Sequence, residues 1–185
     1  MRHHIHILGA SGSGTTTLGK ALAERMGCCH YDTDTYYWLP TEPPFQDKRQ
    51  PEARVRLLSG VLSPDQSWVL SGSLCGWGDA LIPRFSLVVF LRIPPELRME
   101  RLRQREWDRC GEAILPGGKM HDAYLRFLEW AAEYDTGRDV PDVKVRSLQR
   151  HERWLSQLPC PVVRLETDIS VEERVDLILR HCGNV

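Results

Sequence analysis

The order of apolar and amphipathic segments predicts an α/β fold, a three-layer sandwich around a five-stranded parallel sheet. Short apolar runs alternate with segments of helical periodicity, the pattern typical of strands that are joined by right-handed crossover helices. The apolar run at residues 86–93 is nearly continuous, as expected for a central strand covered on both faces. The expected strands are residues 5–8, 28–31, 68–70, 86–93 and 161–165, and the expected helices are residues 17–26, 52–62, 96–105, 121–134, 143–158 and 171–181.

The length and charge of the chain limit the functions that it can have. Its 185 residues are expected to form one domain, residues 1–185. The 24 lysines and arginines nearly balance the 25 acidic residues, so no basic excess favours binding to nucleic acid or to an anionic membrane. No apolar segment approaches the roughly 20 residues that cross a bilayer, and the six cysteines form no regular framework. We therefore expect a cytoplasmic monomer or homodimer that holds any anionic ligand at a local site.

A glycine-rich segment follows the first expected strand and precedes the first expected helix. It reads Gly9-Ala10-Ser11-Gly12-Ser13-Gly14-Thr15-Thr16-Thr17. This context and spacing are those of a GxxxxGK[ST] phosphate loop. Glycines let successive amide groups converge on one anion, and the positive end of the helix dipole adds to the attraction. Thr16 has the position of the hydroxyl that ligates Mg²⁺ in such loops.

One position departs from the phosphate-loop pattern. Thr15 stands where a lysine is expected to reach the β- and γ-phosphates, so a source of transition-state charge stabilisation is missing. Either another cation replaces that lysine, or the site binds nucleotide without transferring phosphate. A glycine-rich tight turn that holds no ligand is a further alternative.

On these residues the chain resembles P-loop kinases of the nucleoside-monophosphate kinase and shikimate kinase type, which are adenylate kinase-like. The variant Gly-Ser-Gly-Thr-Thr-Thr at residues 12–17 is similar to the loop of archaeal-type cytidylate kinases, in which threonine occupies the lysine position of active enzymes. The resemblance implies a P-loop NTPase fold with a short lid at about residues 106–120 and an acceptor-side excursion at about residues 34–62. It also implies ATP and Mg²⁺ as cofactors, with the nucleotide bound by Gly9, Ser11, Gly12, Ser13, Gly14, Thr15, Thr16 and Thr17.

Two carboxylates follow the second expected strand, at the sheet edge where open α/β sheets bind ligands. Asp32 and Asp34 are alternate residues, so both can face one cleft. Resemblance to shikimate and gluconate kinases, which carry Asp-x-Asp here, assigns Asp32 to Mg²⁺ through water and Asp34 to the acceptor hydroxyl. The alternative is that Asp34 caps the next turn or is solvated. Ser71 stands where nucleoside-monophosphate kinases usually carry an acidic residue, which favours the shikimate type.

Glycines and tryptophans mark a candidate acceptor site. Gly72 and Gly76 follow the third expected strand and would let an acceptor approach the backbone. Two aromatic side chains, Trp38 and Trp77, could stack on a ring, and ordinary packing is the alternative. The candidate acceptor-binding residues are therefore Asp34, Trp38, Gly72, Ser73 and Trp77.

Arginines recur at spacings of three and four in the helix expected at residues 96–105, so Arg98, Arg101 and Arg105 are expected to share a face. In the family comparison, Arg101 lies near the adenine and Arg105 reaches the transferring phosphate, a role suited to a planar guanidinium. The alternative is a solvated helix in which glutamates balance the arginines.

The expected lid contains our candidate for the missing cation, Lys119, because the two glycines before it would let it swing over the phosphates. Arg138 and Arg146 are the other candidates. The candidate catalytic residues are therefore Asp34, Arg105 and Lys119, and the candidate metal-binding residues are Thr16 and Asp32.

Together these patterns predict an ATP- and Mg²⁺-dependent phosphotransferase that acts on a nucleoside monophosphate or a hydroxylated metabolite. Thr15 and Ser71 leave open a catalytically silent nucleotide-binding regulatory protein. A nucleotide-independent interaction domain on a relic fold is the third alternative.

Overall fold

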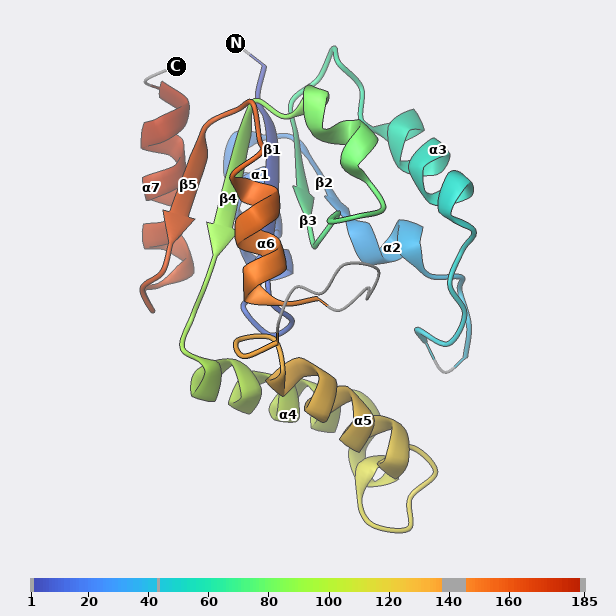
Figure 1. Ribbon diagram of the computed structural model, residues 1–185. Coiled ribbons are helices and arrows are strands. Elements are labelled where there is room, and N and C mark those ends of the chain that lie inside the picture. The colour runs from blue at the N-terminus through green and yellow to red at the C-terminus, as the bar shows by residue number, and fades with distance from the viewer. Residues whose placement is uncertain (1, 43, 138–145, 184–185) are drawn as a thin grey trace.

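Five parallel strands form one sheet in the order β2-β3-β1-β4-β5 (Figure 1). The computed structural model describes residues 2–42, 44–137 and 146–183. The strands are β1 (His4–Gly9), β2 (Cys29–Asp32), β3 (Trp68–Ser71), β4 (Leu87–Leu91) and β5 (Val162–Leu165). The predicted five-stranded parallel sheet is confirmed.

Helices connect the strands along the chain. They are α1 (Thr15–Met26), α2 (Thr33–Tyr37), α3 (Pro51–Val61), the 3-10 helix η1 (Asp79–Arg84), α4 (Pro95–Cys110), the 3-10 helix η2 (Gly111–Ile114), α5 (His121–Ala132), α6 (Leu148–Leu155) and α7 (Val171–Gly183). Across the described residues, none of these helices combines the length and the hydropathy that a membrane crossing needs.

Helices cover both faces of the sheet, which gives the predicted three layers (Figure 1). On one face, Leu22 of α1 and Ile178 of α7 pack against the strands. On the other face, Leu58 of α3, Leu81 of η1 and Trp154 of α6 do the same. Because both faces are covered, the interior strand β4, which lies between β1 and β5, is buried along its whole length, and this explains its continuous apolar sequence.

The sequence pattern missed α2 and η1, and it ended α4 too early. Asp32 starts α2 directly after β2, since its Oδ1 accepts a hydrogen bond of 3.0 Å from the amide of Asp34. Charged residues at 106–110 indicated a lid loop, but they lie on α4, which ends at Gly111 with a positive φ of 53°. The helical part of the hairpin therefore extends into the segment that we expected to be a loop.

Helices α4 and α5 lie side by side and form a hairpin that projects beyond the carboxyl ends of the strands (Figure 1). Arg98 ties the base of this hairpin to the body of the protein, and only 2% of its side chain is exposed. Its Nη2 donates to Asp135 Oδ2 at 2.8 Å, and its Nη1 donates to the Ser11 carbonyl at 3.2 Å. The expectation that Arg98 shares an open face with Arg101 and Arg105 is wrong, because Arg98 points into the protein while the other two are exposed.

Loss of Asp135 would leave the Arg98 guanidinium buried without its carboxylate partner. We expect Asp135→Ala to lower the free energy of unfolding by about 3 kcal/mol, and the added change Arg98→Met to recover part of that loss. Urea unfolding followed by circular dichroism measures both. The control is Asp65→Ala, which removes an exposed ion pair with Arg2 and should cost less than about 1 kcal/mol. Equal losses at the two sites would contradict this account of Arg98.

Candidate functional site

The loop between β1 and α1 has the conformation that anion binding needs. Gly12 and Gly14 have φ values of 84° and 95°, in the region that favours glycine. Gly14 is the N-cap of α1, no side chain caps the helix there, and the first turn holds no acidic residue. The first amide groups of α1 are therefore available to a ligand from solvent.

The two glycines serve the loop in different ways. A Cβ atom on Gly12 would lie 2.7 Å from the Arg98 carbonyl oxygen and from Leu102 of α4, whereas one on Gly14 would meet nothing within 4 Å. Ser13 is buried, and its amide and hydroxyl both donate to the Ala10 carbonyl, at 3.1 and 2.8 Å. The Gly12 side of the loop thus packs on α4, and the Gly14 side faces open space.

The Asp32 carboxylate links the phosphate loop to two other segments. Its Oδ2 accepts hydrogen bonds from Thr16 Oγ1 at 2.7 Å and from Ser71 Oγ at 3.2 Å. Its Oδ1 accepts from the amide of Asp34. The two residues predicted to bind the metal, Thr16 and Asp32, are therefore in direct contact, and Asp32 also holds the start of α2.

Sequence reasoning missed the way in which Ser71 supports Asp32. Ser71 is fully buried at the end of β3, and its Oγ lies 2.9 Å from His30 Nε2. Because the Ser71 proton is directed at Asp32, His30 donates from Nε2 to the Ser71 oxygen. Burial lowers the pKa of His30, so the ring is neutral and adds no charge beside Asp32. Ser71, which stands where an acidic residue was expected for the nucleoside-monophosphate kinase type, thus supplies a hydroxyl donor that orients Asp32.

Asp34 lies on α2, two residues beyond Asp32. Asp34 is an exposed residue, and partial burial of its carboxyl group raises its pKa. The charge of Asp32 raises the pKa further. The cations Arg146 and Arg105 and a hydrogen bond from Trp38 partly offset the increase. The charges of Asp32 and of two arginines therefore act on Asp34 in opposite directions.

Two of the predicted acceptor residues have structural partners. Ser73 is buried, and its Oγ lies 3.0 Å from His151 Nε2. Gly72 has a φ of 102°, and a Cβ there would collide with the Thr33 side chain of α2. The glycine is therefore required for packing between the end of β3 and α2, a reason that the sequence did not reveal.

The tryptophans of the predicted acceptor site are part of an aromatic cluster. Trp77 donates from Nε1 to the Ser73 carbonyl at 2.9 Å, and its ring meets Tyr37 edge to face. Trp38 also meets Tyr37 edge to face, and Lys48 Nζ lies over its ring at 5.8 Å. These contacts favour the packing alternative for both tryptophans, and Trp38 contributes through its hydrogen bond to Asp34.

The exposed arginines of α4 point to different partners. Arg101 pairs with Asp168, which lies between β5 and α7, at 3.2 Å. Arg105 pairs with Glu106 at 2.9 Å and lies over Phe127 of α5, and its charge reaches Asp34. Arg105 is therefore close to the candidate acceptor residue, and Arg101 lies at the other side of the site.

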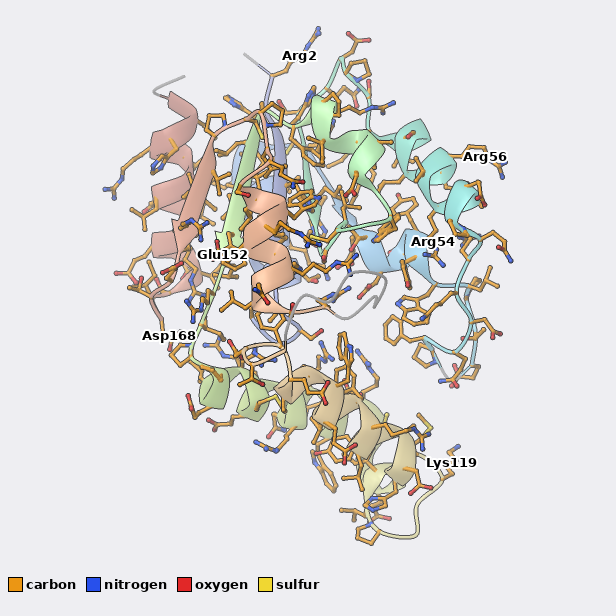
Figure 2. The ribbon with its side chains drawn as sticks, in the orientation of Figure 1. Arg2, Arg54, Arg56, Lys119, Glu152 and Asp168 are labelled. Atoms are coloured by element: carbon orange, nitrogen blue, oxygen red, sulfur yellow. The ribbon has the colours of Figure 1, made fainter. Side chains whose placement is uncertain are left out.

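Lys119 lies in the outer part of the α4–α5 hairpin (Figure 2), just before α5. Arg146 is the cation whose charge acts most strongly on Asp34. Arg138 lies outside the described residues. The charges of Arg146 and Arg105 therefore act on Asp34, whereas Lys119 in this position is remote from the base of the hairpin.

The donor set fits a magnesium nucleotide. Mg²⁺ prefers oxygen ligands, and Thr16 and Asp32 present a hydroxyl and a carboxylate oxygen 2.7 Å apart beside the phosphate loop. The uncapped start of α1 supplies amide donors of the kind that hold phosphate oxygens. The amides and Thr16 lie at the start of α1, and Asp32 ends β2. Because Thr16 and Asp32 are in contact, one ligand can meet the amides and both side chains together.

A family model described as an AAA domain (AAA_18) matches residues 5–113, from β1 to η2. The chain belongs to this family of P-loop kinase domains. The match includes the phosphate loop, Asp32 and Asp34, and the end of β3. The residues of the candidate site on the first three strand ends and on α4 therefore lie inside the matched region, and Arg146 lies outside it.

Two relatives match over nearly their full length. The chain is 49% identical over 184 residues to the uncharacterized protein YqaC of Bacillus subtilis (strain 168), covering 100% of this chain and 99% of that protein. It is 30% identical over 176 residues to a shikimate kinase of Moorella thermoacetica, covering 85% of this chain and 99% of that protein.

Solved structures share the fold at lower identity. A shikimate kinase from Bacteroides thetaiotaomicron has a TM-score of 0.58 at 20% identity and covers 98% of both chains. A gluconokinase from Sinorhizobium meliloti 1021 has a TM-score of 0.53 at 18% identity, covering 100% of this chain and 94% of that chain. These likenesses confirm the kinase-like P-loop fold. The similarity of residues 12–17 to the cytidylate kinase loop, and the role of each site residue, stay predictions.

The different surroundings of the two loop glycines can be tested. We expect Gly12→Ala to lower the free energy of unfolding by about 3 kcal/mol, because the methyl group meets the α4 backbone and the φ is unfavourable for alanine. Gly14→Ala has only the backbone cost and should lose about 1 kcal/mol. Thermal and urea unfolding measure both. A larger loss at Gly14 would contradict the packing described for Gly12.

Proposed function

We propose that this protein transfers the γ-phosphate of ATP, with Mg²⁺, to a hydroxyl or phosphate group of a small acceptor. The observation that carries the proposal is the Asp32 carboxylate, which accepts a hydrogen bond from Thr16 of the phosphate loop and one from the Asp34 amide. Residues suited to the nucleotide, the metal and the acceptor thus belong to one hydrogen-bonded unit. A solved shikimate kinase that shares the fold was determined in complex with shikimate, which supports a small-molecule acceptor.

The phosphate loop and Asp32 would bind the nucleotide. Amides at the start of α1, from Gly14 onward, would donate to phosphate oxygens, and Thr16 and Asp32 would hold Mg²⁺. When bound, the ion neutralises phosphate charge and orients the γ-phosphate. The hydrogen bonds from Ser71 and from the Asp34 amide keep Asp32 in one orientation, so the metal-binding oxygens need little rearrangement.

Asp34 would act on the acceptor. In its ionised form it accepts the proton of the attacking hydroxyl as that oxygen bonds to the γ-phosphorus and the bond to ADP breaks. The raised pKa of Asp34 makes it a stronger base than an ordinary aspartate. Arg105 and Arg146, whose charges reach Asp34, are placed to stabilise negative charge on the phosphoryl group and take the role of the absent loop lysine.

Thr15 favours a second function, a regulatory protein that binds nucleotide without transferring phosphate. The neutral side chain at this position removes one contact to the β- and γ-phosphates. The two functions differ in one measurable respect, which is turnover in the presence of the correct acceptor.

The test is transfer from γ-labelled ATP, with Mg²⁺, across a panel of nucleoside monophosphates, shikimate, gluconate and other hydroxylated acids. We expect one acceptor class to become labelled with turnover well above the hydrolysis of ATP alone. Asp34→Asn should lower kcat at least about 100-fold and leave the KM for ATP within severalfold. Asp176→Asn, an exposed aspartate on α7 that pairs with Arg25, is the matched control and should keep full activity. Tight ATP binding with no labelled product from any acceptor would favour the regulatory function.

The raised pKa of Asp34 also predicts how pH affects activity and stability. Transfer should fall as the pH drops through this pKa, at a higher pH than for an ordinary aspartate near 3.8. The folded protein holds the Asp34 proton more tightly than the unfolded chain, so ionisation at neutral pH costs stability. Asp34→Asn should therefore be more stable than the wild type at pH 7, and the gain should vanish below about pH 3.8. Urea unfolding at a series of pH values measures the difference, and a variant that is less stable at pH 7 would contradict the assigned environment.

A further inference from the structure

Three buried polar side chains join segments that are distant in sequence. Tyr134 follows α5, His151 lies on α6, and Ser73 follows β3, and all three are less than a tenth exposed. The Tyr134 hydroxyl lies 2.8 Å from His151 Nδ1, and Ser73 Oγ lies 3.0 Å from His151 Nε2. The imidazole therefore bridges the base of the hairpin and the segment that follows β3.

This cluster does not have the properties of a nucleophile and its base. Burial, and then the charges of Arg146 and His6, lower the pKa of His151 to about 3, so the ring is a weak base at neutral pH. Ser73 is only 6% exposed. The space beside Tyr134, which is also lined by Ser11 and Arg98, is too small for a water molecule. The arrangement instead suits a neutral imidazole that donates from one nitrogen and accepts at the other.

One end of the cluster reaches the phosphate loop. The Arg98 guanidinium lies over the Tyr134 ring at 5.4 Å and donates to the Ser11 carbonyl and to Asp135. The amide of Leu148, at the start of α6, donates to the Tyr134 carbonyl at 2.8 Å. The position of Tyr134 is therefore fixed by the loop that would bind phosphate and by both helices that meet at the base of the hairpin.

The other end reaches α2. The Ser73 carbonyl accepts the hydrogen bond from Trp77 Nε1, and the Trp77 ring contacts Tyr37 of α2, the helix that carries Asp34. The same turn begins at Ser71, which donates to Asp32. The segment after β3 is thus hydrogen-bonded to His151 through Ser73, and it contacts α2 through Trp77.

We propose that His151, Tyr134 and Ser73 are positioning residues that couple the phosphate loop to the acceptor-side helix α2. A series of mostly buried contacts connects the phosphate loop to α2. It runs through Ser11, Arg98, Tyr134, His151, Ser73, Trp77 and Tyr37. Hydrogen bonds in such surroundings are strong and have few alternative partners, so a shift of the phosphate loop is transmitted to the turn after β3. This inference rests on the proposed nucleotide site and adds that nucleotide binding arranges the acceptor side.

The test follows both ends of the series by NMR in ¹⁵N-labelled full-length protein. A non-hydrolysable ATP analogue with Mg²⁺ is titrated into the wild type, Tyr134→Phe and Ser73→Ala, each checked for folding by thermal unfolding. Backbone amides of Gly14 and Thr15 report nucleotide at the loop, and the Trp77 indole signal, assigned with Trp77→Phe, reports the acceptor side. The control is Trp68→Phe, which removes an indole hydrogen bond to Ser63 at the far end of β3.

In the wild type and in the control we expect both reporters to shift. In Tyr134→Phe and Ser73→Ala the loop amides should shift as in the wild type, while the Trp77 shift falls at least about twofold. Two such variants keep the test decisive if one of them fails to fold. A full Trp77 shift in a folded variant, with the loop amides also shifting, would overturn the coupling and leave the nucleotide site standing. Loop amides that do not move in the wild type would instead overturn the proposed function, and the coupling with it.

Discussion

Among the residues that the structure describes, no side chain caps the amide groups at the start of α1, and the candidate site is arranged around them. Gly14 begins the helix without a side-chain cap, and no carboxylate occupies its first turn. Unpaired amides aligned with the positive end of a helix dipole favour an anion. The loop holds this conformation because Ser13 bonds to the Ala10 carbonyl and because Gly12 packs on α4 where no side chain would fit.

Asp32 extends this arrangement to the acceptor side. The same carboxylate accepts from the loop through Thr16, from β3 through Ser71 and from the Asp34 amide of α2. Without it, the start of α2 would lose its cap, and the orientation of Asp34 relative to the loop would no longer be fixed. A single side chain thus links the oxygens proposed to bind the metal to the helix that carries the candidate base.

Local sequence patterns predicted the strands, the phosphate loop and the Asp32 and Asp34 pair, because each depends on neighbouring residues. The predictions failed where a residue's structure depends on contacts with distant parts of the chain. Glu106, Asp108 and Arg109 are charged residues on the surface of α4, so composition alone could not separate this segment from a loop. The burial of Arg98 depends on Asp135 and on the Ser11 carbonyl, which no spacing rule connects to it.

The same limit applied to the candidate site. Gly72 is required for packing against Thr33, and Ser73 is engaged by His151, 78 positions further along the chain. Arg146 was one of several basic residues that could replace the loop lysine. Its effect on the pKa of Asp34 distinguishes it from Lys119, and only the packing of distant segments reveals that effect.

Calorimetric titration of ATP with and without Mg²⁺, into the wild type and Thr16→Val, tests whether the amides of α1, with Thr16 and Asp32, bind a magnesium nucleotide without the usual lysine. We expect Mg²⁺ to tighten ATP binding at least about tenfold in the wild type, and Thr16→Val to lose most of that gain. Affinity that is independent of Mg²⁺, or an absence of binding at saturating ATP, would contradict the claim.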